Sequence, residues 1–170
     1  LAYIEYMVSL SQNAEETVVI QSDNKILEGF RYEQEVEQFL RKAVEEDLFE
    51  GYYQPVYSIK NKSFITLEAL SRLKHPTLGM IPPDVFIGIA EKQGLISDVG
   101  NLQLRRVCRF IKEHEYLMEK IWNVKFNLSP SELMKTGYSH VLIGIIQEYG
   151  LKKISVNLYF FLFINAVISA

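Results

Sequence analysis

Residues 65–72, with the sequence ITLEALSR, place one carboxylate inside an apolar run and an arginine four positions later. As a helix, this stretch would set Glu68 and Arg72 side by side as an exposed ion pair worth only a few tenths of a kcal/mol. As a strand, it would put Glu68, Leu70 and Arg72 on one face, with the two charges roughly 13 Å apart. Helix propensity slightly favours the helix. Only a strand would make this stretch the wall of a catalytic site.

The composition is that of a globular protein rather than a disordered one, with 48% hydrophobic and 23% charged residues in a chain of 170. A net charge of −3 provides no basic field for nucleic-acid phosphates, so we expect no nucleic-acid polymer as a partner. The single cysteine, Cys108, excludes an intramolecular disulfide and a cysteine zinc cluster, which fits a reducing compartment. The chain begins at Leu1 without a methionine, which suggests a fragment.

The first 47 residues predict two helices and a short strand. Residues 1–10 are typical of a helix end, and the apolar run 17–20 of a short buried strand, as in the last elements of an upstream domain. Between residues 25 and 47 the spacing predicts an amphipathic helix, whose apolar positions are Phe30, Tyr32, Val36, Phe39, Leu40, Ala43 and Val44. Its acidic face is either simply solvated or part of a linker helix that couples two domains or pairs with another copy.

Residues 49–128 predict a hairpin, two helices and a strand. The aromatic run 49–57 indicates a strand that enters a hairpin through the turn 60–63. Helices are expected from just after Pro83 to Gly94 and from 98 to 120, and Cys108 lies in the apolar stripe of the second, as a core thiol. His114 lies in a charged stretch and is interpreted as a surface residue. A short strand follows at 123–128.

The C-terminal third begins with a helix-start signal. Ser129 and Glu132 have the spacing of a capping box, with Pro130 at the first helical position, and predict one helix that ends at Gly150. Asn127, where the preceding strand stops, is either a turn residue or a side chain that points into a site. Residues 154–170 carry no charge; the run is at the short limit for a membrane helix and too long for one strand.

Three motifs occur in a fixed order: YQPV at 53–56, EALSR at 68–72 and NLSP at 127–130, with PDVFI at 83–87 between the last two. Together they resemble the EAL domain, the bacterial phosphodiesterase that hydrolyses the second messenger cyclic di-GMP. The resemblance covers about residues 49–151, and four motifs in the right order make it specific. The helix at 24–48 resembles the linker that joins a GGDEF (diguanylate cyclase) domain to an EAL domain, and residues 1–23 are expected to be a remnant of such an upstream domain.

The resemblance implies an α/β fold: an incomplete TIM-like (β/α) barrel whose first strand is antiparallel, preceded by the amphipathic linker helix. Glu68 would lie on the second strand at the C-terminal mouth of the barrel. Glu68 and Asn127 would be ligands of Mg²⁺ or Mn²⁺, Arg72 would contact substrate phosphate, and Gln54 and Leu70 would line the substrate groove. Oxygen ligands suit Mg²⁺, and a metal pair can activate water and stabilise charge on a phosphodiester.

The sequence also departs from the family pattern. The family's fourth strand carries a metal-binding glutamate in a motif like Glu-Ile-Thr-Glu, but here residues 154–158 are ISVNL and no acid follows. The Asp-Asp-Phe-Gly motif and a later lysine and glutamate are also missing, and a complete barrel needs about 250 residues. We therefore expect residues 49–153 to be the N-terminal part of an EAL domain and 154–170 to be a non-family tail, produced by a frameshift or read-through.

Three functions are compatible with this pattern. The parent protein would hydrolyse cyclic di-GMP to linear pGpG, with this chain inactive by itself; alternatively, the chain is a non-catalytic cyclic di-GMP-binding module, or a non-functional remnant. The expected partners are cyclic di-GMP, an upstream GGDEF or sensor domain, and a second copy that pairs with the open sheet edges of a half barrel. The expected location is the cytoplasm, including the cytoplasmic part of a membrane-bound sensor.

Overall fold

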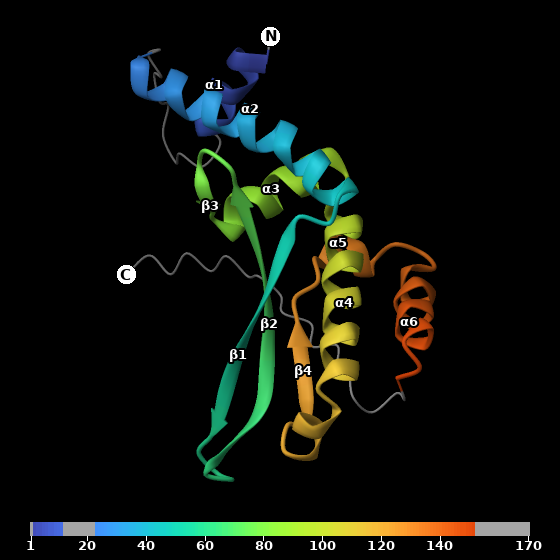
Figure 1. Cartoon of the computed structure of the whole chain (residues 1–170). Helices are drawn as coiled ribbons and strands as arrows, with labels where there is room; N and C mark the ends of the chain where they lie inside the picture. The colour runs from blue at the N-terminus through green and yellow to red at the C-terminus, as the bar shows by residue number, and fades with distance from the viewer. Residues whose placement is uncertain (1, 12–22, 152–170) are drawn as a thin grey trace.

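Strand β2 (Ser63–His75) is the centre of the four-stranded sheet formed by the described residues. One edge pairs antiparallel with β1 (Phe49–Ser58); the other pairs parallel with β4 (Asn123–Phe126) and antiparallel with β3 (Gly79–Ile81). Figure 1 shows β1 and β2 as one long hairpin with β4 beside it. Residues 65–72 are therefore a strand, and the antiparallel first strand is confirmed.

The computed structural model describes residues 2–11 and 23–151. The predicted strand at 17–20 and the tail at 154–170 lie outside these ranges. Besides the four strands, the described residues form seven helices: α1 (Ala2–Ser11), α2 (Asn24–Glu45), α3 (Pro83–Gln93), α4 (Ile96–Glu113), the 3₁₀ helix η1 (Glu115–Glu119), α5 (Pro130–Leu133) and α6 (Tyr138–Glu148). Within the described ranges, no helix combines the length and the apolar character that crossing a membrane requires.

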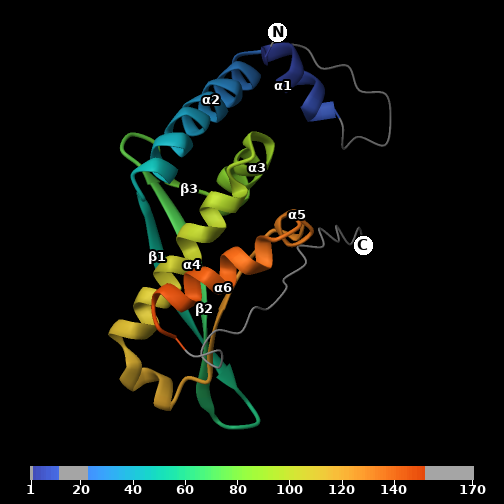
Figure 2. The ribbon, with the colours of Figure 1, turned by 90° about the vertical axis from the view of Figure 1, so that its right-hand side faces the viewer.

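Helices α4 and α6 cover one face of the sheet, as Figure 2 shows. Because side chains alternate along a strand, Leu67 and Ala69 of β2 point to this face, whereas Glu68 points to the other. The core beneath the helices combines these two residues with Leu104, Val107, Cys108, Ile111, Ile121, Val124, Phe126, Leu128, Tyr138, Leu142 and Ile145. Burial of each large aliphatic side chain contributes about 1.5–3 kcal/mol to folding.

A second core lies where α2 meets α3 and the ends of β1 and β2. Asp23 caps α2 by accepting a hydrogen bond from the Ile26 amide at 2.8 Å, and the predicted apolar stripe places Val36, Leu40 and Ala43 at 0% exposure. They pack with Phe49, Leu73, Ile81, Phe86, Ile89, Ala90, Ile96 and Val99. The predicted amphipathic helix is confirmed. Its second half is part of the folded core, while its role as a linker stays a prediction.

The helix predicted at 98–120 is shorter than expected. Helix α4 ends at Glu113, and η1 follows as a separate turn of 3₁₀ helix. The reason lies at His114, which leaves the helical conformation (φ −125°, ψ 40°) while its ring stacks on Phe110 and its Nδ1 lies 3.0 Å from the Phe110 carbonyl oxygen. His114 is thus partly buried rather than a free surface residue. Cys108 is a core thiol as predicted, and burial raises its pKa to about 11.

The single helix predicted from Ser129 to Gly150 is wrong, because the chain forms α5 and α6 with a turn between them. Gly137, which precedes α6, has φ 84°, in the left-handed region where a residue with a Cβ is strained. The sequence analysis also missed β3, because a strand of three residues is too short to show alternating apolar and polar side chains. The strand forms by pairing its backbone with the end of β2.

The predicted capping box is present at the start of α5, and its glutamate is buried, which is unusual for a charged residue. The backbone N–H of Ser129 donates to Glu132 Oε2 at 3.1 Å, as the motif predicts. The Glu132 side chain is only 1% exposed and lies against Gly100 of α4 and the Tyr138 hydroxyl. Burial raises the pKa of Glu132, and the nearby Tyr138 hydroxyl and the hydrogen bond from the Ser129 amide oppose that shift only in part.

Replacing Gly137 by alanine is expected to lower the free energy of unfolding by about 1–2 kcal/mol, because alanine at a positive φ is strained. The matched control is Gly144→Ala inside α6, where an added Cβ meets no atom within 4 Å. That variant should be about 0.5–1 kcal/mol more stable than the wild type. Urea unfolding followed by circular dichroism measures both, and equal effects of the two substitutions would contradict the left-handed turn.

Glu132→Gln tests the buried carboxyl, because glutamine keeps an oxygen for the Ser129 amide but cannot ionise. A raised folded-state pKa means that the folded protein binds this proton more tightly than the unfolded chain. The wild type should therefore lose stability relative to the variant as pH rises above the ordinary value of 4.5. The measurement is the difference in urea midpoint against pH. The exposed Glu115→Gln serves as control, and a wild-type urea midpoint that rises relative to that of Glu132→Gln as pH rises would contradict the raised pKa.

Candidate ligand-binding site

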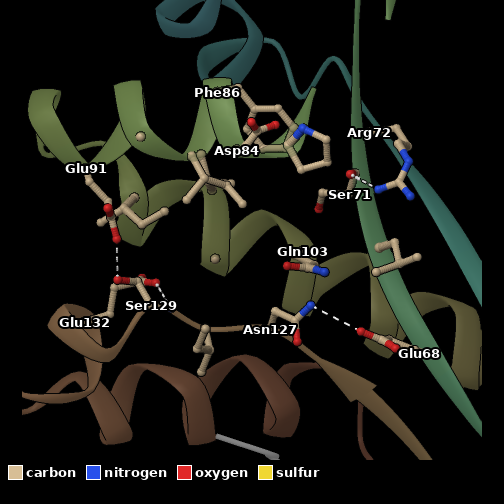
Figure 3. Close-up of a pocket in the computed structure, with 18 residues that line it drawn as sticks. Glu68, Ser71, Arg72, Asp84, Phe86, Glu91, Gln103, Asn127, Ser129 and Glu132 are labelled. Carbon is tan, nitrogen blue, oxygen red and sulfur yellow. Dashed lines mark hydrogen bonds between the residues drawn. The ribbon is translucent and has the colours of Figure 1, made fainter. Parts of the chain in front are cut away.

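A cavity of about 640 Å³ opens between β2, α3, the first half of α4 and the turn between β4 and α5. Figure 3 shows its polar side chains arranged around this space. Its walls are made by Glu68, Leu70, Ser71, Arg72, Pro83, Asp84, Phe86, Ile87, Gly88, Glu91, Ile96, Val99, Gly100, Gln103, Asn127, Leu128, Ser129 and Glu132. The size falls in the range of small-molecule and cofactor sites, which combine apolar walls with a few polar groups.

Glu68 and Asn127 meet at the edge of this cavity, where the parallel strands β2 and β4 separate. The Asn127 side-chain amide donates to Glu68 Oε1 at 3.4 Å, and both side chains are half-buried. The register pairs Glu68 with Lys125, so Asn127 follows two residues later at the C-terminal end of β4. The structure thus brings together two residues that lie 59 positions apart in the sequence.

Leu70 and Arg72 line the same cavity, two and four residues further along β2 from Glu68. Arg72 Nη1 donates to the Ser71 carbonyl oxygen at 2.9 Å, and its guanidinium lies 5.8 Å from the centre of the Tyr52 ring. A guanidinium has five N–H donors, so this single bond leaves donors for a ligand.

Gln54 does not line the cavity, although it lies next to Glu68 on the sheet. The two residues are direct partners in the antiparallel register of β1 and β2, and their side chains therefore share one face. Gln54 is exposed at this position. Of the five residues singled out from the sequence, Glu68, Leu70, Arg72 and Asn127 come together in the cavity wall, and Gln54 lies beside it.

Several wall residues were not found by sequence reasoning. Ser129 and Glu91 join the two sides of the cavity, because the Ser129 hydroxyl donates to Glu91 Oε1 at 2.7 Å. Gln103 donates from α4 to the Ala69 carbonyl oxygen of β2 at 2.8 Å. A signal for Gln103 was present: it occupies a buried position of α4, four residues from Val99 and from Val107, where the apolar periodicity predicts a hydrophobic residue.

The charges on the cavity wall are unbalanced. Glu68, Asp84, Glu91 and Glu132 contribute four carboxyl groups, against the single guanidinium of Arg72. Burial raises the pKa of Glu132, which reduces the tendency of that carboxyl to ionise. Such a wall favours a cation, or a ligand that presents N–H donors to the carboxylates.

The Glu68 and Asn127 side chains fit one side of a Mg²⁺ or Mn²⁺ site, because a carboxylate and an amide carbonyl are oxygen ligands of the kind these ions prefer. Their present contact, through the Asn127 nitrogen at 3.4 Å, needs only a rotation of the amide to present both oxygens to an ion. Within the part of the chain that the structure describes, no three histidine, cysteine, aspartate or glutamate side chains cluster around one point. Glu68 and Asn127 are thus the candidate protein ligands for such an ion among the described residues.

Comparison with known proteins shows similarity over most of the chain. The sequence profile of the family described as EAL domain matches residues 37–158. The cyclic di-GMP phosphodiesterase NbdA of Pseudomonas aeruginosa is 33% identical over 119 residues, which are 70% of this chain and 15% of NbdA. The signaling protein YkoW of Bacillus subtilis is 42% identical over 73 residues, 43% of this chain and 9% of YkoW.

Solved structures have the same fold. The phosphodiesterase PaMucR, determined as a c-di-GMP complex, superposes with a TM-score of 0.67 at 30% identity, over 73% of this chain and 50% of that one. The FimX EAL domain superposes with a TM-score of 0.64 at 24% identity, over 74% of this chain and 50% of that one, which supports the fold alone. The chain thus spans half of each superposed structure and 15% of NbdA. With the family profile matching residues 37–158, this chain belongs to the EAL domain family.

Proposed function

We propose that the cavity binds cyclic di-GMP and that this chain supplies part of a metal-dependent phosphodiesterase site. The observation that carries the proposal is the meeting of Glu68 and Asn127 at the ends of two parallel strands, with Arg72 in the same cavity wall. NbdA is named a cyclic di-GMP phosphodiesterase, and PaMucR is a phosphodiesterase determined with c-di-GMP. The similarity of both to this chain supports the choice of ligand.

The wall chemistry suits the two parts of a cyclic dinucleotide. The Arg72 guanidinium would bind a phosphate, because charge-assisted N–H bonds to phosphate oxygens are strong. Carboxylates such as Asp84 and Glu91 would accept hydrogen bonds from guanine N–H groups, which is the acceptor role of an ionised carboxylate. A Mg²⁺ or Mn²⁺ ion held by Glu68 and Asn127 would supply Lewis-acid chemistry at a phosphodiester oxygen. The roles of Glu68, Arg72 and Asn127 rest on their positions in the family motifs, and those of Asp84 and Glu91 on their place in the cavity wall.

The number of ligands favours binding over hydrolysis for this chain alone. A metal that activates water and also holds a phosphodiester needs several fixed ligands, and the described residues supply Glu68 and Asn127. We propose that residues 1–170 bind cyclic di-GMP without cleaving it and that hydrolysis belongs to the parent protein. The same reasoning supports the alternative of a non-catalytic binding module.

The wild-type chain is expected to bind cyclic di-GMP saturably in the presence of Mg²⁺, and Arg72→Ala should weaken binding at least about tenfold, because a charge-assisted hydrogen bond is worth about 1.5–3 kcal/mol. The matched control is Arg109→Ala, which removes an exposed arginine of α4 outside the cavity wall. Isothermal titration calorimetry measures all three. Equal affinities of the Arg72 and Arg109 variants, or a wild type that does not bind, would contradict the proposal.

Purified chain incubated with cyclic di-GMP and Mg²⁺ or Mn²⁺ should produce no linear pGpG above the buffer background. The reason is that, among the residues that the structure describes, no cluster of three or more acidic, histidine or cysteine side chains surrounds Glu68. Chromatography of the nucleotides after increasing times is the measurement, and the Glu68→Ala variant is the control for contaminating activity. Turnover by the wild type that disappears in Glu68→Ala would show that the chain carries a complete site.

A further inference from the structure

We propose that Gln103 is a positioning residue that fixes Glu68 and Asn127 where β2 and β4 separate; this inference rests on the proposed function. The ladder between the two strands runs from the Thr66–Asn123 pair to the Ala69–Phe126 pair and ends there. Glu68 directly precedes Ala69, and Asn127 directly follows Phe126. The last pair of the ladder therefore sets the positions from which both side chains project.

Gln103 binds this last pair from outside the sheet. Its Nε2 donates to the Ala69 carbonyl oxygen at 2.8 Å, and its side chain is only 9% exposed. A buried carbonyl without a partner is costly, so an amide at this point stabilises the backbone where the ladder ends. Figure 3 shows Gln103 beside Asn127 and close to β2, in the wall of the cavity.

Helix α4 holds Gln103 rigidly. The neighbouring Leu104, with 0% exposure, and Val107, with 1%, pack in the same core as Val124 and Phe126 of β4. Apolar packing therefore holds α4 against the sheet, and Gln103 adds a hydrogen bond from α4 to the backbone of β2. Loss of the hydrogen bond between Gln103 and Ala69 would let β2 move relative to β4 at the place where Glu68 and Asn127 have to meet.

Packing alone does not account for an amide at this position. Val99 and Val107, one turn away on either side, are buried and apolar, and a leucine or valine would suit the same face of α4. A buried amide carries a desolvation cost that its hydrogen bond only offsets, whereas an aliphatic side chain would add burial without that cost. A positioning function explains why glutamine occurs here, because only a side chain with a hydrogen-bond donor can bind the Ala69 carbonyl oxygen.

The test compares Gln103→Leu with Gln93→Leu. Gln93, on α3, is a matched control because both polar atoms of its side chain are buried without a hydrogen-bond partner and it lies outside the cavity wall. Gln103→Leu should raise the Kd for cyclic di-GMP, and the Mn²⁺ concentration for half-maximal binding, about tenfold or more, as is typical when a residue supporting a metal ligand is removed. Gln93→Leu should change neither, and urea midpoints give the folded fraction of each variant.

Amide hydrogen exchange provides a readout without ligand. In Gln103→Leu, exchange at residues 68–71 and 127–129 should be faster than in the wild type and in Gln93→Leu. The slowest core amides exchange through global unfolding, so their rates are interpreted with the global stability that the urea midpoints give. Gln103→His keeps a ring N–H donor and should restore slow exchange and binding in part. A general loss of stability would accelerate exchange throughout the chain and would not be rescued by a donor.

The outcomes separate the two proposals. A wild-type chain that binds no cyclic di-GMP would refute the proposed function, and the exchange comparison would still decide whether Gln103 holds the end of the ladder. Unchanged affinity, Mn²⁺ midpoint and local exchange in Gln103→Leu would refute the positioning role even if the wild type binds the ligand.

Discussion

The backbone of β2 is hydrogen-bonded along both edges, and the arrangement of the other elements follows from that. A helix at 65–72 would satisfy its own N–H and C=O groups, but it would leave β1 and β4 without a partner between them. Unpaired buried backbone groups are costly enough to outweigh a small difference in helix propensity. The strand is therefore selected by tertiary pairing rather than by local preference, as is common for sequences whose helix and strand propensities are nearly equal.

Once β2 is a strand, alternate side chains point to opposite faces of the sheet, so the residues that pack in the core are separated from those that line the cavity. Leu67 and Ala69 are committed to the core beneath α4 and α6, which leaves Glu68 and Leu70 on the opposite face toward the cavity. A shift of register by one residue would bury the carboxylate and expose the apolar side chains, so the core fixes the site. Gln103 connects the two faces, because it reaches from the packed helix α4 to the backbone of the residue after Glu68.

The sequence singled out four residues that line one cavity, but it missed several local details of the fold. Glu68, Leu70, Arg72 and Asn127 were found because their motifs are short, ordered and tied to one chemistry, and the hairpin and the capping box followed from turn and cap signals. The ends of α4 and the break before α6 were not found, since they depend on the His114 and Phe110 contact and on a single positive φ at Gly137. Gln103 was missed because its role depends on Ala69, 34 positions away in the chain.

The charge of the cavity wall limits how a phosphodiester can bind there. Two phosphates would approach four carboxyl groups and one guanidinium, and repulsion between like charges within a few ångströms is considerable in a partly buried site. The raised pKa of Glu132 weakens one of these repulsions, and Arg72 offsets another. A cation between Glu68 and the phosphate would offset the rest, which explains why the carboxylate that faces Asn127 is better suited to hold a metal than to contact the ligand directly. Under the proposed function, the affinity for a cyclic dinucleotide in this cavity would therefore depend on the divalent cation concentration, whether or not the bond is cleaved.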